Sequence, residues 1–162
     1  MTISVGDKLP GATLLQMGAE GPEAVDLANK LKDRKVVIFG LPGAFTGACT
    51  TAHMPSFMRT REAFGAKGVE EVICIAVNDP FALKAWGEST GAEKAGITLL
   101  GDPSAALTKA LGMDFSAPAL GLINRSSRYA MVVDDGVVSV LNLEAEAGVC
   151  ELTKGEELLA AM

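Results

Sequence analysis

Three short apolar runs, each followed by residues that open a loop or a helix, constrain the fold of this chain more than any other feature. They cover residues 35–39, 72–77 and 97–100. Short continuous runs of this kind, with several β-branched side chains, favour buried strands. Pro42 and Gly43 break the first run, whereas Asp-Pro pairs at 79–80 and 102–103 follow the other two. Asp followed by Pro is typical of a helix N-terminus, so strands and helices are expected to alternate.

Helices are expected at 48–66, at about 80–88 and from Asp102 to Gly112. Right-handed crossovers make the three strands parallel, so the loops that follow them emerge at one edge of the sheet. Open α/β folds bind their ligands at this edge. Cys49, Asn78-Asp79 and Asp102 are expected to share it.

The remaining segments complete a recognisable layout. Residues 12–15 and 25–27 flank a Gly- and Glu-rich segment and predict a peripheral hairpin. Further predicted strands cover 119–123, 128–133 and 137–143, with a hairpin turn at Asp134-Asp135-Gly136 and a final helix at 154–161. Parallel strands joined by helices, then a hairpin and a closing helix, predict an α/β thioredoxin-like fold. Its central mixed sheet would be flanked by helices and extended by the N-terminal hairpin.

Composition narrows the class of protein. The chain has 162 residues, 49% of them hydrophobic, and no Pro/Ser-rich linker, so one domain over residues 1–162 is expected. A net charge of −6 argues against partners such as nucleic acid or an anionic membrane surface. Residues 1–7 lack the basic and apolar regions of a signal peptide, and no apolar run approaches membrane-spanning length. The expected location is therefore cytoplasmic.

The chain has three cysteines, Cys49, Cys74 and Cys150. Their odd number and wide spacing do not fit a disulfide framework or a zinc site. Cys49 and His53 could share a metal, but the other two cysteines lack the paired spacing of structural zinc sites. We therefore expect reduced thiols with redox chemistry, no metal and no cofactor.

Cys49 is predicted to lie in the first turn of the 48–66 helix. Unpaired N–H groups and the positive dipole end at such a turn favour a thiolate over a thiol. The small residues Gly47 and Ala48 should leave the sulfur room to meet a substrate. Thr46 can present its hydroxyl as a backbone cap or towards the atom that the sulfur attacks. Pro55 should remove one hydrogen bond and bend the helix.

The residues around Cys49 resemble a known family. Pro42-x3-Thr46-x2-Cys49 matches the active-site pattern of peroxiredoxins. The longer run 42–46, with His53 and Pro55 after the cysteine, is similar to the peroxiredoxin 5 or type II branch. Similarity extends to residues 77–79, 86–87, 102–103, 128–129 and 131–133, and so covers almost the whole chain.

This resemblance implies a thiol peroxidase that reduces hydrogen peroxide and alkyl hydroperoxides. The Cys49 thiolate would attack the terminal oxygen, which gives water or an alcohol and a Cys49 sulfenic acid. The catalytic arginine of the family immediately precedes an aromatic residue, so the resemblance assigns this role to Arg128, before Tyr129. Thr46 would help to hold the oxygens, and Pro42 would shield the pocket from water. Arg125 is expected to be a solvated charge in a turn.

The recycling of the sulfenic acid is left open by the sequence. Cys150 resembles the resolving cysteine of animal peroxiredoxin 5, and its predicted loop can approach Cys49 more readily than a strand can. Cys74 lies in a predicted interior strand, where a buried, inert thiol is expected. Plant type II relatives nevertheless carry a cysteine at that spacing. We favour Cys150, but a one-cysteine cycle is equally consistent. The reductant would be glutathione with glutaredoxin, or thioredoxin.

Two further hypotheses concern partners and alternative functions. Phe45 and Phe81 could form an exposed apolar patch at the edge that forms a homodimer contact in relatives, so a homodimer is expected. His53 invites a Cys-His hydrolase hypothesis, but a packing or hydrogen-bonding role is favoured. A non-enzymatic redox sensor or holdase that uses Cys49 is the main alternative to an enzyme.

Overall fold

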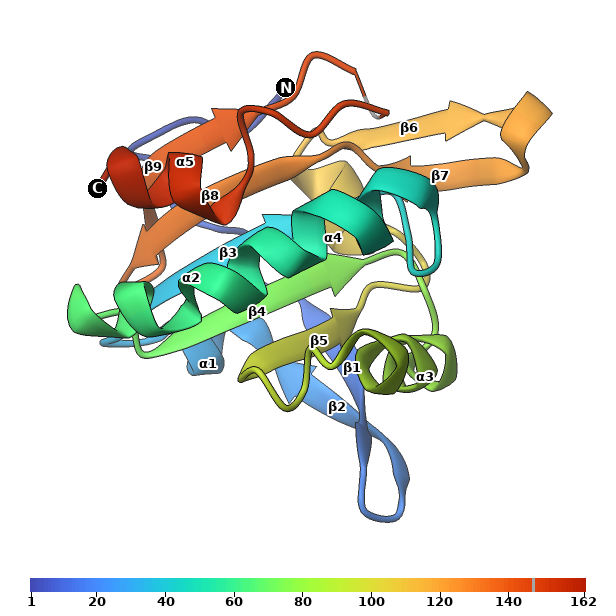
Figure 1. Ribbon diagram of the computed structural model, residues 1–162, viewed down its shortest axis with the longest axis horizontal. Coiled ribbons are helices and arrows are strands. Elements are labelled where there is room, and N and C mark those ends of the chain that lie inside the picture. The colour runs from blue at the N-terminus through green and yellow to red at the C-terminus, as the bar shows by residue number, and fades with distance from the viewer. Residues whose placement is uncertain (147) are drawn as a thin grey trace.

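A seven-stranded mixed sheet forms the centre of the molecule in a computed structural model that describes residues 1–146 and 148–162 (Figure 1). Its strand order is β2-β1-β5-β4-β3-β8-β9, and a separate two-stranded sheet consists of β6 and β7. The strands are β1 (Thr13–Gly18), β2 (Gly21–Asp26), β3 (Lys35–Gly40), β4 (Glu71–Ala76), β5 (Ile97–Gly101), β6 (Asp114–Ala117), β7 (Leu122–Ser126), β8 (Tyr129–Asp134) and β9 (Val137–Leu143). The helices are α1 (Leu27–Leu31), α2 (Met54–Ala66), α3 (Pro80–Thr90), α4 (Ala106–Ala110) and α5 (Gly155–Ala160), with a π-helical turn η1 (Cys49–His53) and a 3₁₀ turn η2 (Pro118–Leu120).

The predicted thioredoxin-like arrangement is confirmed. Strands β3, β4 and β5 are parallel, and β8 runs antiparallel to β3. The N-terminal hairpin β1–β2 joins the sheet through Leu15, which pairs with Gly101 of β5. At the opposite edge, the turn at Asp135-Gly136 connects β8 to β9, as expected, and both residues have positive φ angles. The N-terminal hairpin β1–β2 therefore extends the sheet at one edge, as predicted.

Helices cover both faces of the sheet and enclose two cores. On one face, α2, α3 and α5 pack over a cluster that includes Phe39, Phe57 and Trp86. On the other face, α1 and α4 cover a cluster that includes Ile38 and Leu107. The side chains of β3 alternate between the two clusters, as the period of a strand requires. A strand buried on both faces explains why its sequence reads as a continuous apolar run.

The helix predicted from Asp102 to Gly112 is shorter than expected. It begins at Ala106, after Ala105 adopts a left-handed conformation with φ of 61°. The Asp102 carboxylate still accepts hydrogen bonds from the N–H groups of Leu107 and Thr108, at 3.3 and 2.8 Å. The capping role of Asp102 was therefore predicted correctly, but not the residues between the cap and the helix.

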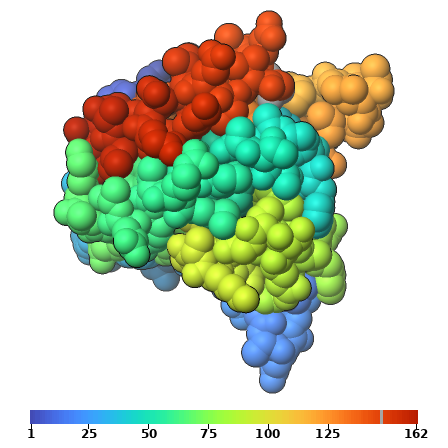
Figure 2. Space-filling model, viewed as in Figure 1, coloured from blue at the N-terminus to red at the C-terminus, as the bar shows by residue number. Residues whose placement is uncertain are grey.

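The region between α4 and β8 also differs from the prediction. Residues 119–123 were expected to form a strand, but Ala119 and Leu120 lie in the 3₁₀ turn η2. Strand β7 begins at Leu122 and pairs with β6, which was not predicted. This hairpin projects from the body of the molecule, as the orange segment in Figures 1 and 2 shows. Helix α1 was also missed, because five residues are too short for a clear helical period.

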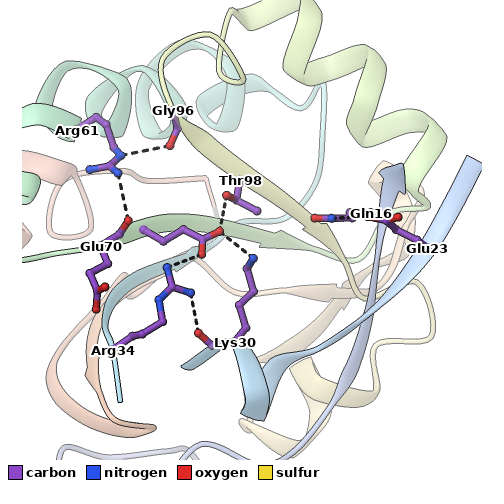
Figure 3. A network of polar contacts seen from close by, with 9 residues as sticks. Gln16, Glu23, Lys30, Arg34, Arg61, Glu70, Gly96 and Thr98 are labelled. Atoms are coloured by element: carbon purple, nitrogen blue, oxygen red, sulfur yellow. Dashed lines mark hydrogen bonds and ion pairs between the residues drawn. The ribbon is translucent and has the colours of Figure 1, made fainter. Parts of the chain in front are cut away.

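The surface around Glu71 is held by a polar network rather than by apolar packing. Lys30 and Arg34 form ion pairs with the two carboxylate oxygens of Glu71, at 3.1 and 2.9 Å, and the Thr98 hydroxyl donates to the carboxylate at 2.6 Å. Figure 3 shows Lys30, Arg34 and Thr98 converging there. Burial alone would raise the pKa of Glu71, but the hydrogen bonds and the lysine charge lower it below its ordinary value. The network links α1 to β4 and β5.

Candidate active site

The loop after β3 leads directly into the π-helical turn that carries Cys49. The Met54 N–H donates to the Cys49 carbonyl, five residues back, instead of four as in an α-helix. Pro55 follows at the start of α2 and has no N–H to donate. The widened turn thus coincides with the position where the proline interrupts the hydrogen-bond ladder, and such turns often mark functional sites. The predicted helix at 48–66 is confirmed, with an irregular first part.

Cys49 is buried, with no exposed surface. Gly47 and Ala48 were expected to leave the sulfur room to meet a substrate, but in this conformation the covering structure would have to move before a substrate could reach it. The guanidinium of Arg128 contacts the sulfur, and its Nη2 donates to Sγ at 3.3 Å. A cation at this distance in a buried site stabilises negative charge on the sulfur. The expected pairing of Cys49 with Arg128 is thus present in the fold.

His53 fixes the guanidinium of Arg128. Nη1 of Arg128 donates to Nδ1 of His53 at 3.1 Å, and Nε2 of His53 donates to the Thr153 carbonyl at 3.0 Å. Burial, and then the charge of Arg128, lower the pKa of His53 to about 3. The imidazole is therefore neutral at physiological pH, which leaves Nδ1 free of a proton and able to accept. The favoured hydrogen-bonding role of His53 agrees with this geometry, and a Cys-His hydrolase pair does not.

Thr46 and Pro42 lie in the loop on the other side of the cysteine. The Thr46 hydroxyl donates to the Gly43 carbonyl at 2.7 Å. The Thr46 carbonyl accepts from the Thr50 N–H at 3.1 Å. Pro42 is buried. The donated hydrogen bond leaves the Thr46 oxygen with lone pairs for another donor.

Arg125 is not the solvated turn charge that we expected. It lies in β7, is partly buried, and its Nη1 donates to the Pro42 carbonyl at 3.0 Å. On the same loop, Oδ1 of Asn78 accepts from the Ala44 N–H at 2.9 Å. Asn78 is thus brought to the loop before Cys49, as expected for the ends of neighbouring parallel strands, whereas the carboxylates of Asp79 and Asp102 bond to the starts of α3 and α4. The contact of Arg125 could not be predicted, because it depends on the unpredicted β6–β7 hairpin.

The two other cysteines lie in different environments. Cys74 is buried in β4, and burial, with a smaller effect of Cys49, raises its pKa well above the ordinary value. Cys150 is partly exposed on the segment between β9 and α5, and burial is the main cause of a more modest rise in its pKa. Its Sγ lies 3.9 Å from Oγ1 of Thr153. Both thiols therefore favour the protonated form.

Glu144 holds the segment that follows Cys150. Its carboxylate accepts from the N–H groups of Glu151, Leu152 and Thr153 at 2.9–3.2 Å, and from the Thr153 hydroxyl at 2.7 Å. Although burial alone would raise the pKa of Glu144, these hydrogen bonds lower it. Because the Thr153 carbonyl holds His53, Glu144 supports the network behind Arg128. Sequence analysis missed Glu144 and Thr153, and no local motif marks them.

The edge of the site also carries exposed aromatic side chains. Phe45 is 58% exposed and adopts a positive φ of 63°, and Phe81 at the start of α3 is 64% exposed. A left-handed conformation is strained for a bulky residue and is typical of functional loops. Phe45 and Phe81, from which we predicted an exposed apolar patch, are therefore both exposed.

The arrangement can support nucleophilic chemistry at sulfur. A buried thiolate beside an arginine can attack an electrophilic oxygen, and the same guanidinium can stabilise the departing charge. Over the described residues, no three His, Cys, Asp or Glu side chains gather as potential metal ligands. Among the same residues, no helix has the length and apolar character needed to span a bilayer. The thioredoxin-like fold and this site define a cysteine-dependent redox enzyme.

Comparisons with known proteins narrow this class. The Redoxin family model matches residues 4–159. Rice (Oryza sativa subsp. japonica) chloroplastic peroxiredoxin-2E-2 is 47% identical over 99% of this chain and 73% of that protein. Reduced Prx3 from Vibrio vulnificus, solved in complex with H₂O₂, is 41% identical with a TM-score of 0.92 over 99% of both chains. Peroxiredoxin 5 from Alvinella pompejana is 29% identical with a TM-score of 0.84 over 98% of this chain and 97% of that one. The chain belongs to the peroxiredoxin family, in its type II branch, and is a thiol peroxidase.

Proposed function

We propose that this chain reduces hydrogen peroxide and alkyl hydroperoxides with Cys49 as the attacking nucleophile. The observation that carries the proposal is the 3.3 Å contact between Sγ of Cys49 and Nη2 of Arg128 in a buried site. The complex of the Vibrio vulnificus relative with H₂O₂ supports the choice of substrate.

In the proposed reaction, the Cys49 thiolate attacks the terminal oxygen of the hydroperoxide. An S–O bond forms as the O–O bond breaks, and the electron pair of the O–O bond leaves on the other oxygen. The products are a Cys49 sulfenic acid and an alkoxide or hydroxide, which takes up a proton to give an alcohol or water. Arg128 would stabilise the departing oxygen, and Thr46 would orient the peroxide. Pro42 would limit the access of water.

A peroxide must displace part of the covering structure to reach Cys49, since the sulfur has no exposed surface. The path that we favour runs through residues 44–48, where Phe45 and Gly47 are exposed and the other residues are partly exposed. On the opposite side, Arg128 and His53 are buried beneath α5 and the Glu144 network. Opening the loop at residues 44–48 would leave the Arg128 guanidinium in contact with the sulfur, whereas opening the side of Arg128 and His53 would break that contact.

For the recycling step, we propose that Cys150 resolves the sulfenic acid. The Cys150 sulfur would attack Sγ of Cys49, an S–S bond would form, and the hydroxyl would leave as water after protonation. Cys150 is favoured over Cys74, because it lies outside the sheet and is partly exposed. Moving Cys74 would disrupt β4 in the middle of the sheet. Thioredoxin, or glutathione with glutaredoxin, would then supply two electrons to regenerate the thiols.

A coupled assay tests the peroxidase proposal. Peroxide-dependent oxidation of NADPH would be followed with thioredoxin and its reductase, and separately with glutathione, glutaredoxin and glutathione reductase. We expect multiple turnovers with at least one system and none for Cys49→Ser. Retained turnover in Cys49→Ser would refute the role of Cys49. A single stoichiometric oxidation of the wild-type chain would instead favour a redox sensor or holdase. The more efficient system identifies the reductant.

Mass spectrometry after one equivalent of peroxide tests the resolving step. We expect a Cys49–Cys150 disulfide in the wild type, and a sulfenic acid at Cys49 in Cys150→Ser. Cys74→Ser should behave like the wild type. A stable sulfenic acid in the wild type would instead establish a one-cysteine cycle.

We also propose that the chain forms a homodimer through the patch of Phe45 and Phe81. Both aromatic side chains are more than half exposed beside the candidate site. Sedimentation analysis of the wild type and of Phe81→Lys tests this proposal, and we expect the variant to be monomeric. A monomeric wild type at micromolar concentration would contradict it.

The single domain over residues 1–162 and the cytoplasmic location stay predictions from the sequence.

A further inference from the structure

We infer that Arg125 is a positioning residue that fixes the loop leading to Cys49. The inference deepens the proposed function, because it concerns the same site. Arg125 comes from β7, in the hairpin that projects from the body in Figures 1 and 2. Its guanidinium nevertheless reaches back to the loop after β3, where Nη1 donates to the Pro42 carbonyl at 3.0 Å. A peripheral hairpin thereby contributes a cation to the wall of the site.

The guanidinium of Arg125 occupies the space that a side chain at residue 43 would take. A Cβ built at Gly43 would overlap Nη1 of Arg125 and would lie 3.4 Å from Oδ1 of Asn78. A side chain at this position would therefore have to displace the guanidinium from the backbone. The absence of a side chain lets Arg125 bind the backbone itself.

Two further hydrogen bonds extend this effect towards the sulfur. Asn78 accepts from the Ala44 N–H at 2.9 Å, so Pro42 and Ala44 are held from outside on either side of Gly43. The Gly43 carbonyl in turn accepts from the Thr46 hydroxyl at 2.7 Å. The position of the Thr46 oxygen thus depends on the loop that Arg125 holds. Arg125 acts on the substrate through this loop, whereas Arg128 contacts the sulfur directly.

Arginine suits this role better than lysine. A guanidinium has several donors in a fixed plane, and a charge-assisted hydrogen bond to a carbonyl is stronger than a neutral one. Lysine would retain the charge but not the planar group that lies against Gly43. The Arg125→Lys variant should therefore keep only part of the effect of Arg125.

The first test compares two reactions of Cys49 in Arg125→Met. Reduction of hydrogen peroxide needs the thiolate and an ordered loop, whereas alkylation by iodoacetamide needs the thiolate and only that the loop opens. We expect kcat/KM for hydrogen peroxide to fall about tenfold or more, and the alkylation rate to stay the same or rise, because a loosened loop exposes the sulfur more often. Arg125→Lys should show an intermediate kcat/KM. Arg59→Met, which removes an exposed ion pair with Glu156, is the matched control and should leave both rates unchanged.

The outcomes separate this inference from the proposed function. Wild-type protein without peroxide turnover would refute the proposed function itself. With an active wild type, an unchanged kcat/KM in Arg125→Met would overturn the positioning role. An equal fall in peroxide reduction and alkylation would also overturn it, because Arg125 would then act on the thiol or on folding.

A double-mutant cycle provides a second test that does not depend on Arg125→Met alone. Gly43→Ala should displace the guanidinium and lower kcat/KM by a factor similar to that of Arg125→Ala. In the Arg125→Ala background, the added methyl group meets no guanidinium, so Gly43→Ala should cost less than it does in the wild type. Losses that multiply independently would contradict the contact between the two residues.

Discussion

Cys49 lies between two sides of the site that are built differently. On one side, Arg128, His53 and Thr153 form a buried chain of hydrogen bonds that ends at the sulfur. On the other side, the loop 42–46 is partly exposed, and Arg125 contacts its backbone from a separate hairpin. The first side places the charge of Arg128 at the sulfur, whereas the second holds the backbone of the loop 42–46 in position. The proposed function therefore assigns charge stabilisation and substrate alignment to separate parts of this fold.

The central sheet positions the charged side of the site. Tyr129, the residue after Arg128, pairs with Gly40 at the end of β3. A Cβ at Gly40 would overlap the Tyr129 ring, so the ring packs directly against the Gly40 backbone. The register between β3 and β8 thereby brings Arg128 to the start of the Cys49 loop. The loop side is attached through single hydrogen bonds, which leaves it easier to open.

The largest effect should follow from breaking the charged side at Arg128. Arg128→Met retains much of the bulk but removes the cation and its donors, so kcat/KM for hydrogen peroxide should fall about 10²–10³-fold. Arg128→Lys should recover part of the loss, since it keeps the charge without the planar group. Steady-state rates in the coupled assay measure both variants. A loss for Arg128→Met smaller than that for Arg125→Met would reverse the ranking of the two sides.

The buried side also predicts a pH dependence of stability. The pKa of His53 is about 3 in the fold, compared with 6.5 in a model peptide, so the unfolded chain binds the proton more readily. The contribution of neutral His53 is therefore fully present above about pH 6.5 and is lost as the pH falls towards 3, by at most about 1.4 kcal/mol per pH unit.

Denaturant unfolding between pH 7 and pH 4.5 checks this prediction. His53→Gln has no titrating group at this position, and its free energy of unfolding should fall less steeply than that of the wild type. Parallel curves for the two proteins would show that His53 does not titrate as its buried position predicts.

A smaller effect is expected when the loop side loses its hydrogen bond to Asn78. Asn78→Ala removes the acceptor for the Ala44 N–H, so kcat/KM should fall about three- to tenfold, as expected for a hydrogen bond worth about 1 kcal/mol. Asn78→Asp keeps an acceptor oxygen and should retain most of the rate. The iodoacetamide rate should not fall in either variant. If Asn78→Ala slowed alkylation as much as peroxide reduction, the two sides would not be separable.

The smallest effect is expected at the periphery of the charged side. Glu144→Gln weakens the hydrogen bonds that hold residues 151–153, and should speed formation of a Cys49–Cys150 disulfide about threefold by freeing the resolving segment. Quenched samples after a pulse of peroxide, analysed by mass spectrometry, give this rate. Glu146→Gln, an exposed carboxylate in the same region, is the control. A slower rate in Glu144→Gln would indicate that the network favours disulfide formation.

Local sequence patterns predicted much of the fold, but not all of it. The runs that became β3, β4, β5 and β9 were clear, because strands buried in a sheet need continuous or alternating apolar residues. Helix α3 was equally clear from Asp79, whose carboxylate accepts from the Ala82 N–H at 2.8 Å. Strand β6 and helix α1 escaped prediction, since short exposed elements leave little periodicity in the sequence.

By itself, the sequence determined that Cys49 follows a buried strand at the start of a helix, and that the chain resembles the peroxiredoxins. These features depend on neighbouring residues and on periodic patterns. Only the tertiary structure decided that Arg125 reaches the Pro42 carbonyl, that His53 and Thr153 hold Arg128, and that Glu144 secures the segment after Cys150. The physical reason is that the hydrogen bonds of Arg125 and His53 join residues far apart in the chain, and that those of Glu144, to residues at most nine positions away, belong to no periodic pattern. Their distance and direction follow from strand register and helix packing, which no local pattern specifies.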